Sequence, residues 1–320
     1  MSRPTILTTL YATADGPSPL GPDVQLIQGK ATGLMPRGDV LARVGPADVL
    51  VNCSELKVDD ELLDAAGRLK IVVNLSAGID NLDLDLLARR GIWAVNSPDQ
   101  FTESTAEWAF GLLLAVTRQV LEADRFVRSG QWQIGNMKLG LYKSMCLSDK
   151  TLGVIGYGRI GRAVARRAEA FGMRVLFHSP SAKDDPSYRP LDELLAASDV
   201  VSLHVPLTET TRHLVNRDTL ARMKPGAIFI NTSRGKTVDE AALAAALHAG
   251  HLGGAGLDVF ENEPNIHPDL LTAPNTVLSP HMGAGTLKSI ADCWCLAAEN
   301  IALVLAGKPP KEPLNRPAGK

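Results

Sequence analysis

The stretch that decides the predicted fold is Leu152-Gly153-Val154-Ile155-Gly156-Tyr157-Gly158-Arg159-Ile160-Gly161. An apolar run typical of a strand leads into three glycines spaced G-x-G-x-x-G, and the helix-like segment Arg162–Phe171 follows directly. Gly156 permits a tight turn, Gly158 lets the backbone approach a pyrophosphate, and Gly161 lets a helix pack close to the strand. The N–H groups at the start of that helix would bind the phosphates. The stretch therefore predicts a dinucleotide-binding turn.

Outward from this turn, strand-like and helix-like segments alternate along most of the chain, which predicts an α/β protein with parallel sheets. Residues 151–281 contain six strand-like runs: Leu152–Ile155, Arg174–His178, Val200–Val205, Ala227–Asn231, Gly256–Phe260 and Thr276–Ser279. The segments between them have helical composition: Arg162–Phe171, Leu191–Ala197, Arg217–Met223 and Val238–Ala249. Six parallel strands with helical crossovers make a doubly wound sheet of the Rossmann type.

The first hundred residues repeat this alternation on a smaller scale. Their strand-like runs are Ile6–Thr9, Val49–Cys53, Lys70–Leu75 and Ile92–Asn96, with helix-like segments such as Asp59–Arg68 and Leu84–Arg90 between them. Near the C-terminus, Leu287–Ala306 has the composition of a helix that ends at Gly307. We therefore expect residues 1–100 and 287–320 to form a smaller, flavodoxin-like α/β substrate domain. A dinucleotide-binding domain of residues 101–286 would be inserted into it.

One long helical segment is expected over Thr102–Ser129. Its centre, Trp108–Val116, is apolar nearly all round, which predicts burial at a domain or subunit interface. Together with Gln131–Tyr142, this helix suggests the arm of a symmetric homodimer over residues 102–142.

Composition argues against several classes of protein. The 320-residue chain carries 33 Lys and Arg against 35 Asp and Glu, so no basic surface for nucleic acid or an anionic membrane is expected. The N-terminus lacks the apolar core of a signal peptide, and no apolar run is long enough to span a bilayer. The four cysteines form no C-x-x-C pair and have no histidine at metal-ligand spacing. This favours reduced thiols in a cytoplasmic protein without a metal.

Three charged side chains follow strand-like runs of the larger domain: Arg234, Glu263 and His281. The carboxyl ends of parallel strands share one edge, where ligands bind, so we expect these side chains to converge. They can then serve as a carboxylate anchor, an orienting group and a proton donor, which predicts an enzyme. Glu261 competes with Glu263 for the carboxylate role.

The end of the second strand of the larger domain departs from the pattern of NAD-preferring sites, which place Asp or Glu there. Here the strand ends in Phe177-His178-Ser179-Pro180, and the first carboxylate downstream is Asp184. His178 and Ser179 could donate hydrogen bonds to a 2′-phosphate, and Lys183 could supply a positive charge. We therefore favour NADP as the cofactor. The alternative is a site that is indifferent to the 2′-phosphate and uses NAD.

Four stretches are similar to the D-isomer-specific 2-hydroxyacid dehydrogenases: Leu152–Gly161, Asn231-Thr232-Ser233-Arg234-Gly235, Gly256-Leu257-Asp258-Val259-Phe260-Glu261-Asn262-Glu263-Pro264 and Ser279-Pro280-His281-Met282-Gly283. The resemblance runs in register from about Asp48 to Gly307, and the chain most resembles the glyoxylate/hydroxypyruvate reductases of that family. It implies that His281 is the general acid for a substrate carbonyl and that Glu263 is its partner. Arg234 would hold the substrate carboxylate and polarise the carbonyl.

The resemblance implies further contacts. For the substrate these are Leu75, Ala77 and Gly78, in a loop that ends a strand of the smaller domain. For the cofactor they are Thr105, Gly156, Gly158, Arg159, Ile160, Gly161, His178, Ser179, His204, Val205, Pro206, Thr232, Ser233, Asp258, His281 and Gly283. Thr105 could instead cap a helix N-terminus, and His204 could be a packed histidine.

The function expected from these features is hydride transfer between NAD(P)H and a small 2-oxo acid, giving a D-2-hydroxy acid. Glyoxylate and hydroxypyruvate are the first candidates, and a homodimer is implied. A phosphite dehydrogenase-like enzyme is an alternative, since it keeps a similar Arg–Glu–His set. Formate dehydrogenase is disfavoured because it carries Gln where Glu263 stands. A second alternative is a dinucleotide-sensing scaffold like the C-terminal-binding corepressors.

Overall fold

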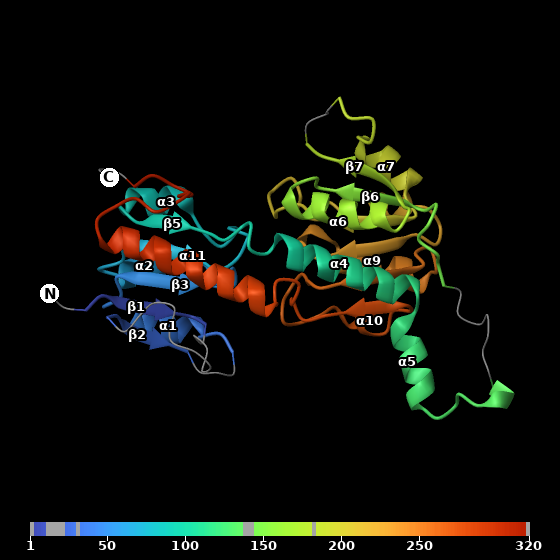
Figure 1. Ribbon diagram of the computed structural model, residues 1–320, viewed down its shortest axis with the longest axis horizontal. Coiled ribbons are helices and arrows are strands. Elements are labelled where there is room, and N and C mark those ends of the chain that lie inside the picture. Colours follow the sequence, from blue (N-terminus) through green and yellow to red (C-terminus); the bar gives the residue numbers. More distant parts are fainter. Residues whose placement is uncertain (1–2, 11–22, 30–32, 137–143, 181–183, 318–320) are drawn as a thin grey trace. The chain divides into compact units, whose positions relative to one another are not determined.

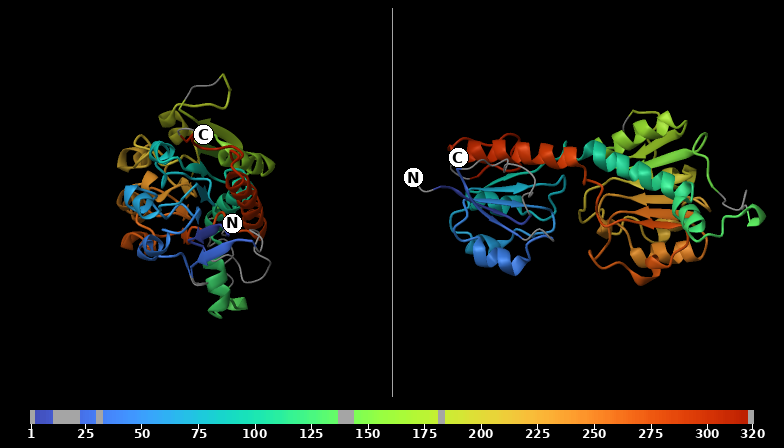
Figure 2. Two further views of the ribbon diagram at one scale, coloured as in Figure 1. Left: turned by 90° about the vertical axis from the view of Figure 1, so that its left-hand side faces the viewer. Right: turned by 60° about the horizontal axis from the view of Figure 1, so that its bottom comes forward.

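The computed structural model describes residues 3–10, 23–29, 33–136, 144–180 and 184–317. The chain divides into two compact units, one of Met1–Phe101 with Thr286–Lys320 and the other of Thr102–Gly285 (Figure 1). Each unit has one parallel sheet with helices on both of its faces (Figure 2). Over the described residues, we find no helix that combines the length and the apolar character needed to cross a membrane.

The sheet of the first unit has the order β2-β1-β3-β4-β5, which is the flavodoxin-like order. Its strands are β1 (Thr5–Thr8), β2 (Gln25–Gln28), β3 (Val49–Asn52), β4 (Ile71–Asn74) and β5 (Trp93–Val95). Its helices are α1 (Arg37–Arg43), α2 (Asp60–Ala65), α3 (Leu84–Arg89) and α11 (Leu287–Leu305). The sequence analysis missed β2 and α1. β2 is a partly exposed edge strand with a polar residue at each end, so it has little of the apolar signal of the buried strands.

The sheet of the second unit has the order β11-β10-β9-β8-β6-β7. Its strands are β6 (Thr151–Ile155), β7 (Arg174–His178), β8 (Val200–Leu203), β9 (Ile228–Asn231), β10 (Gly254–Leu257) and β11 (Thr276–Leu278). The chain passes from β6 to β7 on one side and then crosses to β8 on the other, so the order reverses between β6 and β8. This is the place where doubly wound sheets bind ligands. Beyond β7 the sheet is extended only by an isolated bridge between Phe177 and Tyr188.

Helices cover both faces of this second sheet. α4 (Thr102–Thr117) and α6 (Arg159–Ala170) pack with Ile228 and Ile230 on one face. The other face, which includes Phe229, is covered by α7 (Leu191–Ala197), α8 (Arg217–Ala221) and α9 (Glu240–His248). Residues 228, 229 and 230 thus face the two cores in turn. This alternation is typical of a strand that is buried on both of its faces.

The prediction of one long helix over Thr102–Ser129 is wrong in one respect, because this segment forms two helices. α4 ends at Thr117, and α5 (Val120–Arg128) begins after Gln119, which has a left-handed backbone (φ 50°). A left-handed residue cannot continue a right-handed helix, so the chain changes direction there. The expected burial of 108–116 is found within the second unit, where α4 packs against α6, β9 and β10.

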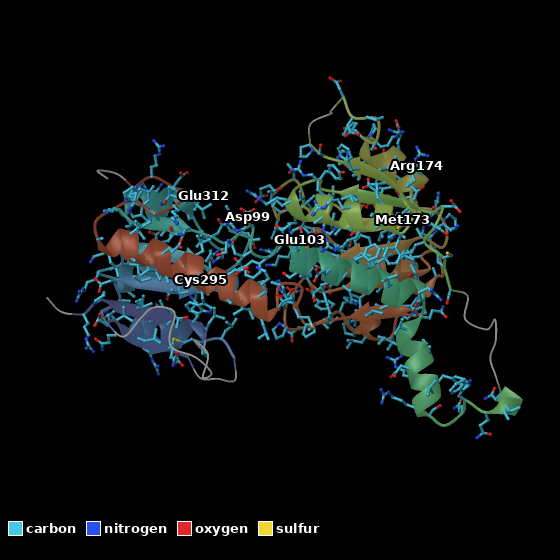
Figure 3. The ribbon with its side chains drawn as sticks, in the orientation of Figure 1. Asp99, Glu103, Met173, Arg174, Cys295 and Glu312 are labelled. Atoms are coloured by element: carbon cyan, nitrogen blue, oxygen red, sulfur yellow. The ribbon has the colours of Figure 1, made fainter. Side chains whose placement is uncertain are left out.

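Ion pairs reinforce the packing of α4 on α6. Glu103, labelled in Figure 3, contacts Arg166 at 2.9 Å and Arg167 at 2.8 Å. Of the arm expected over 102–142, residues 137–142 lie outside the described part of the chain.

Candidate active site

The glycine turn follows β6 and opens α6. Gly156 has φ 94°, and a side chain there would run into the carbonyl oxygen of His204 at 2.3 Å. A side chain on Gly161 would lie 2.1 Å from the carbonyl oxygen of Gly156. Gly158 differs, since a Cβ there would meet no protein atom within 4 Å. The protein's own packing therefore requires glycine at 156 and 161, whereas a side chain at 158 would enter space that the described residues leave open.

The end of β7 carries no carboxylate among its described residues. His178 Nδ1 donates to the carbonyl oxygen of Arg189 at 3.1 Å, and Ser179 is buried. Arg189 was not singled out from the sequence, yet this hydrogen bond places its backbone beside the strand end. Lys183 lies outside the described residues.

The segment after β8 borders the glycine turn. His204 is half-buried, and its Nε2 is in hydrogen-bond contact with Ser202 Oγ at 2.8 Å. Burial lowers the pKa of His204 to about 4, so the ring is neutral near pH 7. The hydrogen bond to Ser202 agrees with the packing role considered for His204, while its backbone touches the turn. Val205 also lies against Gly156, and Pro206 is exposed beyond it.

Arg234 lies in a tightly held loop after β9. Its carbonyl oxygen accepts hydrogen bonds from Asn231 Nδ2 (3.1 Å) and Thr237 Oγ1 (2.5 Å). The next residue, Gly235, approaches the backbone of Phe260 so closely that a Cβ would lie 1.9 Å from it. This contact brings the Arg234 loop against the segment that leads to Glu263.

Two residues of the same loop were expected to bind the cofactor. Ser233 donates both its N–H (2.9 Å) and its Oγ (2.7 Å) to Asn231 Oδ1. Thr232 is buried, and its Oγ1 has no hydrogen-bond partner. A buried hydroxyl without a partner is costly, so this atom is suited to bind a polar group of a ligand.

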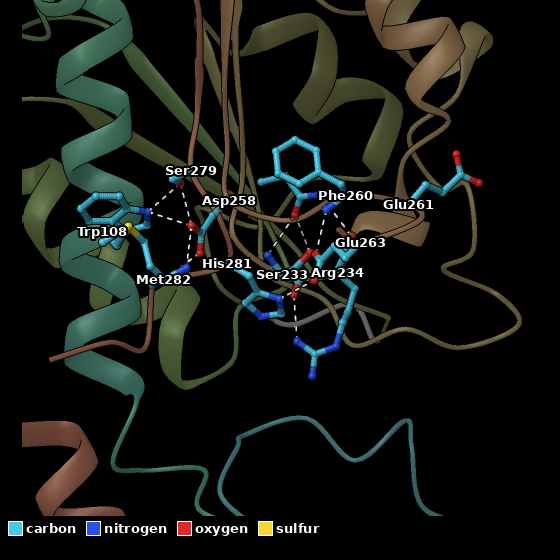
Figure 4. Close-up of polar contacts among 12 residues, drawn as sticks. Trp108, Ser233, Arg234, Asp258, Phe260, Glu261, Glu263, Ser279, His281 and Met282 are labelled. Carbon is cyan, nitrogen blue, oxygen red and sulfur yellow. Dashed lines mark hydrogen bonds and ion pairs between the residues drawn. The ribbon is translucent and has the colours of Figure 1, made fainter. Parts of the chain in front are cut away.

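The structure brings Glu263 and His281 together. Glu263 accepts from His281 Nδ1 through Oε2 at 2.8 Å and from the N–H of Phe260 through Oε1 at 2.9 Å (Figure 4). Burial alone would raise the pKa of Glu263, but the hydrogen bond and charge of His281, the Phe260 N–H and the charge of Arg234 outweigh it and lower this pKa. The carboxyl group is thus held ionised beside the imidazole and near the guanidinium.

Glu261, the competing carboxylate, points elsewhere (Figure 4). Its Oε1 accepts from His213 Nε2 at 2.6 Å. His213 and His281 therefore pair with different glutamates, and the partner of His281 is Glu263.

Asp258 organises the backbone around His281. It lies just past β10, which begins earlier than expected and ends at Leu257. The buried carboxylate accepts four hydrogen bonds, from Trp108 Nε1 (3.1 Å), Ser279 Oγ (2.6 Å) and the N–H groups of Met282 (2.9 Å) and Gly283 (2.8 Å). The Asp258 carbonyl accepts from the N–H of His281 at 2.8 Å.

His281 itself has a left-handed backbone (φ 51°), which is uncommon for a residue other than glycine. The bonds to Asp258 hold it there.

Trp108 was not predicted as part of the site, and no local pattern marks an indole 150 residues away from its partner. Thr105 lies inside α4, which begins at Thr102, so the capping role considered for it is wrong; its Cγ2 is 3.6 Å from the Cβ position of Gly283.

The loop after β4 in the first unit presents backbone N–H groups. The carbonyl of Ala77 accepts from Asn96 Nδ2 (2.9 Å), and that of Gly78 accepts from Ser76 Oγ (2.8 Å) and Asn74 Nδ2 (3.2 Å). Within the part of the chain that the structure describes, the N–H groups of Ala77 and Gly78 donate to no protein acceptor. Leu75 beside them is buried. Fixed carbonyls with outward N–H groups are suited to bind an anion.

Comparison with known proteins gives concordant matches. The model of the D-isomer specific 2-hydroxyacid dehydrogenase NAD binding domain matches residues 110–283. The glyoxylate reductase of Thermococcus litoralis is 43% identical over 290 residues, which cover 88% of this chain and 87% of that protein.

Two solved structures are similar over nearly the whole chain. An NADPH-dependent glyoxylate/hydroxypyruvate reductase of Sinorhizobium meliloti, in complex with NADP and malonate, has a TM-score of 0.83 and 32% identity, covering 98% of this chain and 97% of that one. The D-lactate dehydrogenase of Aquifex aeolicus, complexed with NAD and lactic acid, has a TM-score of 0.80 and 30% identity, covering 95% and 96%. The sequence, the parallel sheets and these matches agree that the chain belongs to the D-isomer specific 2-hydroxyacid dehydrogenase family.

Proposed function

We propose that this protein is an oxidoreductase that transfers hydride between NAD(P)H and a small 2-oxo acid, giving a D-2-hydroxy acid, with glyoxylate and hydroxypyruvate as first substrates. The observation that carries the proposal is the 2.8 Å Glu263–His281 pair at the sheet edge where the Arg234 loop also lies. The names of the relatives point the same way.

The residues of the second unit fit a nicotinamide dinucleotide. Gly156 and Gly161 allow the tight turn, and Gly158 leaves room for a pyrophosphate at the start of α6. The buried Thr232 hydroxyl has no hydrogen-bond partner among the described residues. When bound, the cofactor supplies the hydride. The remaining proposed contacts are Arg159, Ile160, His178, Ser179, His204, Val205, Pro206, Ser233, Asp258, His281, Gly283 and Thr105.

The chain's own part in the reaction is proton transfer and orientation. With Nδ1 of His281 donating to Glu263, Nε2 would deliver the proton to the substrate carbonyl oxygen during reduction and take it back in oxidation. Ionised Glu263 favours the imidazolium form that this step requires. The guanidinium of Arg234 would bind the substrate carboxylate with two matched donors. We propose that Ala77 and Gly78 bind a substrate carboxylate through their N–H groups, and that Leu75 limits side-chain size.

The test is a spectrophotometric panel of NADPH and NADH oxidation with glyoxylate, hydroxypyruvate, pyruvate and phenylpyruvate. Turnover of the first two acids is expected. Phosphite with NADP or NAD is the counter-test, because an Arg–Glu–His set alone does not separate the two chemistries. Turnover of phosphite without turnover of any 2-oxo acid would replace the proposal with the phosphite alternative. Cofactor binding without any turnover would favour a sensing scaffold.

Cofactor preference gives a sharper expectation. No carboxylate stands at the end of β7 to repel a 2′-phosphate, so the KM for NADPH should lie below that for NADH. The matched variant Ser179→Asp introduces such a carboxylate and should shift the preference toward NADH. Initial-rate measurements with both cofactors check this. A tenfold preference of the unaltered protein for NADH would contradict it.

We also propose a homodimer in the cytoplasm. α5 and the residues after it expose apolar side chains, namely Val120 (49%), Leu121 (40%), Val127 (51%), Trp132 (59%) and Ile134 (94%). An exposed apolar patch of this kind marks an interaction surface. Light scattering should give twice the mass of one chain. A variant with both Val127→Asp and Ile134→Asp should give the mass of a single chain. A monomer at micromolar concentration before any substitution would rule out the dimer.

A further inference from the structure

The loop that carries Glu263 is held from outside by one buried side chain. Residues 258–267 join β10 to α10 (Pro268–Leu271), the stretch 261–267 of this connection is the Glu263 loop, and Glu240 is the first residue of α9. Oε1 of Glu240 accepts from the N–H of Glu261 at 2.6 Å, and Oε2 accepts from the N–H of His267 at 3.1 Å. Glu240 is only 6% exposed. A single carboxylate therefore clamps the loop at both of its ends.

Between these two points, the loop is closed by its own hydrogen bonds. The N–H of Asn265 donates to the carbonyl of Asn262 at 2.8 Å, and Glu263 turns back to the N–H of Phe260. The Oε1 of Glu261 accepts from His213 Nε2, so this side chain is directed to His213. Through Glu240, α9 is bound to both ends of the segment that carries Glu263.

We propose that Glu240 is a positioning residue for the Glu263–His281 pair, acting through the two loop N–H groups that it binds. The argument depends on the chemistry of an acceptor. The two loop N–H groups reach different oxygens of Glu240, and a carboxamide would present an NH₂ group to one of them. The carboxylate also sits in the first turn of α9, where the helix dipole stabilises a negative charge. The neighbouring Asp239 cannot substitute, because its side chain caps α9 at the N–H of Ala242 (2.9 Å).

The role of Glu240 rests on the proposed function only where it is tested by measuring activity. Glu240→Gln leaves one loop N–H facing an NH₂ group, so kcat for glyoxylate reduction should fall about tenfold while the dissociation constant of NADPH stays within about twofold. Glu261→Gln is the matched control. It removes a charge from the same loop but keeps the backbone bond to Glu240, so kcat should stay near that of the unaltered protein.

A double-mutant cycle separates positioning from general destabilisation. If Glu240 acts through Glu263, then Glu240→Gln should lower kcat less than about twofold in a Glu263→Gln background. An equal loss in both backgrounds would overturn the proposal.

An NMR titration of the His281 ring tests the same role of Glu240 without any substrate. The ring signal is assigned by its loss in a His281→Asn variant. Among the described residues of the second unit, Glu263 faces this ring at 2.8 Å, and the charge of Arg234 acts on Glu263. Glu240 binds the loop that carries Glu263, and Glu261 of the same loop pairs with His213. Glu240→Gln should lower the midpoint of the His281 titration toward that of Glu263→Gln, and an unchanged midpoint would refute the role of Glu240 whatever the substrate. If Glu240→Gln does not fold, Glu240→Asp decides by the same measurements, since its shorter carboxylate can reach only one of the two N–H groups. Absence of turnover in the unaltered protein would instead count against the proposed function.

Discussion

Replacing His281 by alanine should lower kcat for glyoxylate reduction at least a hundredfold, since general acid catalysis contributes roughly 10²–10⁴-fold. The Glu263 carboxylate orients this imidazole through a hydrogen bond of 2.8 Å. Without it, the developing alkoxide would have to take its proton from water. The dissociation constant of NADPH should stay near normal, because His281 is only one of many proposed cofactor contacts and the glycine turn and Thr232 are left intact. Stopped-flow turnover and fluorescence titration of NADPH measure the two quantities.

His213→Ala is the matched control for this change. His213 also pairs with a glutamate, at 2.6 Å, but lies outside the proposed reaction centre. Its removal should change kcat by less than about threefold. Near-normal turnover in His281→Ala, or an equal loss in both variants, would contradict the assignment of His281 as the acid.

Changing Arg234 to lysine should lower kcat/KM for 2-oxo acids by about two orders of magnitude, because a misplacement near 1 Å can cost that much. The charge is kept, but an ammonium cannot offer the two parallel donors that match a carboxylate. Arg234 Nη1 also donates to the carbonyl of Ser233 at 2.9 Å, a bond that steadies the guanidinium and that lysine would reproduce poorly. Steady-state kinetics with glyoxylate measure the loss.

Arg222→Lys is a suitable control, since Arg222 forms a surface ion pair with Asp192 and should tolerate lysine. An unchanged kcat/KM in Arg234→Lys would remove Arg234 from the substrate site. A loss confined to NADPH affinity would mean that it binds the cofactor.

The fold could be predicted largely from the sequence, because periodicity and the glycine spacing are local signals. Every strand expected in the second unit is present, with ends shifted by a few residues. The break between α4 and α5 could not be predicted, because Gln119 adopts its left-handed backbone without a glycine, proline or asparagine to mark it. β2 was missed because an edge strand needs little apolar character.

The site could be predicted only in part, because only some of its residues are marked by local signals in the sequence. Arg234, Glu263 and His281 follow the carboxyl ends of β9, β10 and β11 by three to six residues, so topology brings them to one edge. Glu261 and Glu263 are two positions apart and have the same local signal. Only the turn between them directs one to His213 and the other to His281. Trp108 and Glu240 act through hydrogen bonds to residues far away in the sequence, which no spacing rule reveals.

The contact at Gly235 limits how this protein can acquire new specificity. Any side chain at that position would occupy the space of the Phe260 peptide, so the arginine-bearing and glutamate-bearing loops cannot be redesigned independently. Libraries that randomise residues 232–235 alone should return glycine at 235 almost without exception. Leu75, which we propose limits side-chain size, belongs to the other unit, so its substitution should leave the Glu263–His281 pair undisturbed.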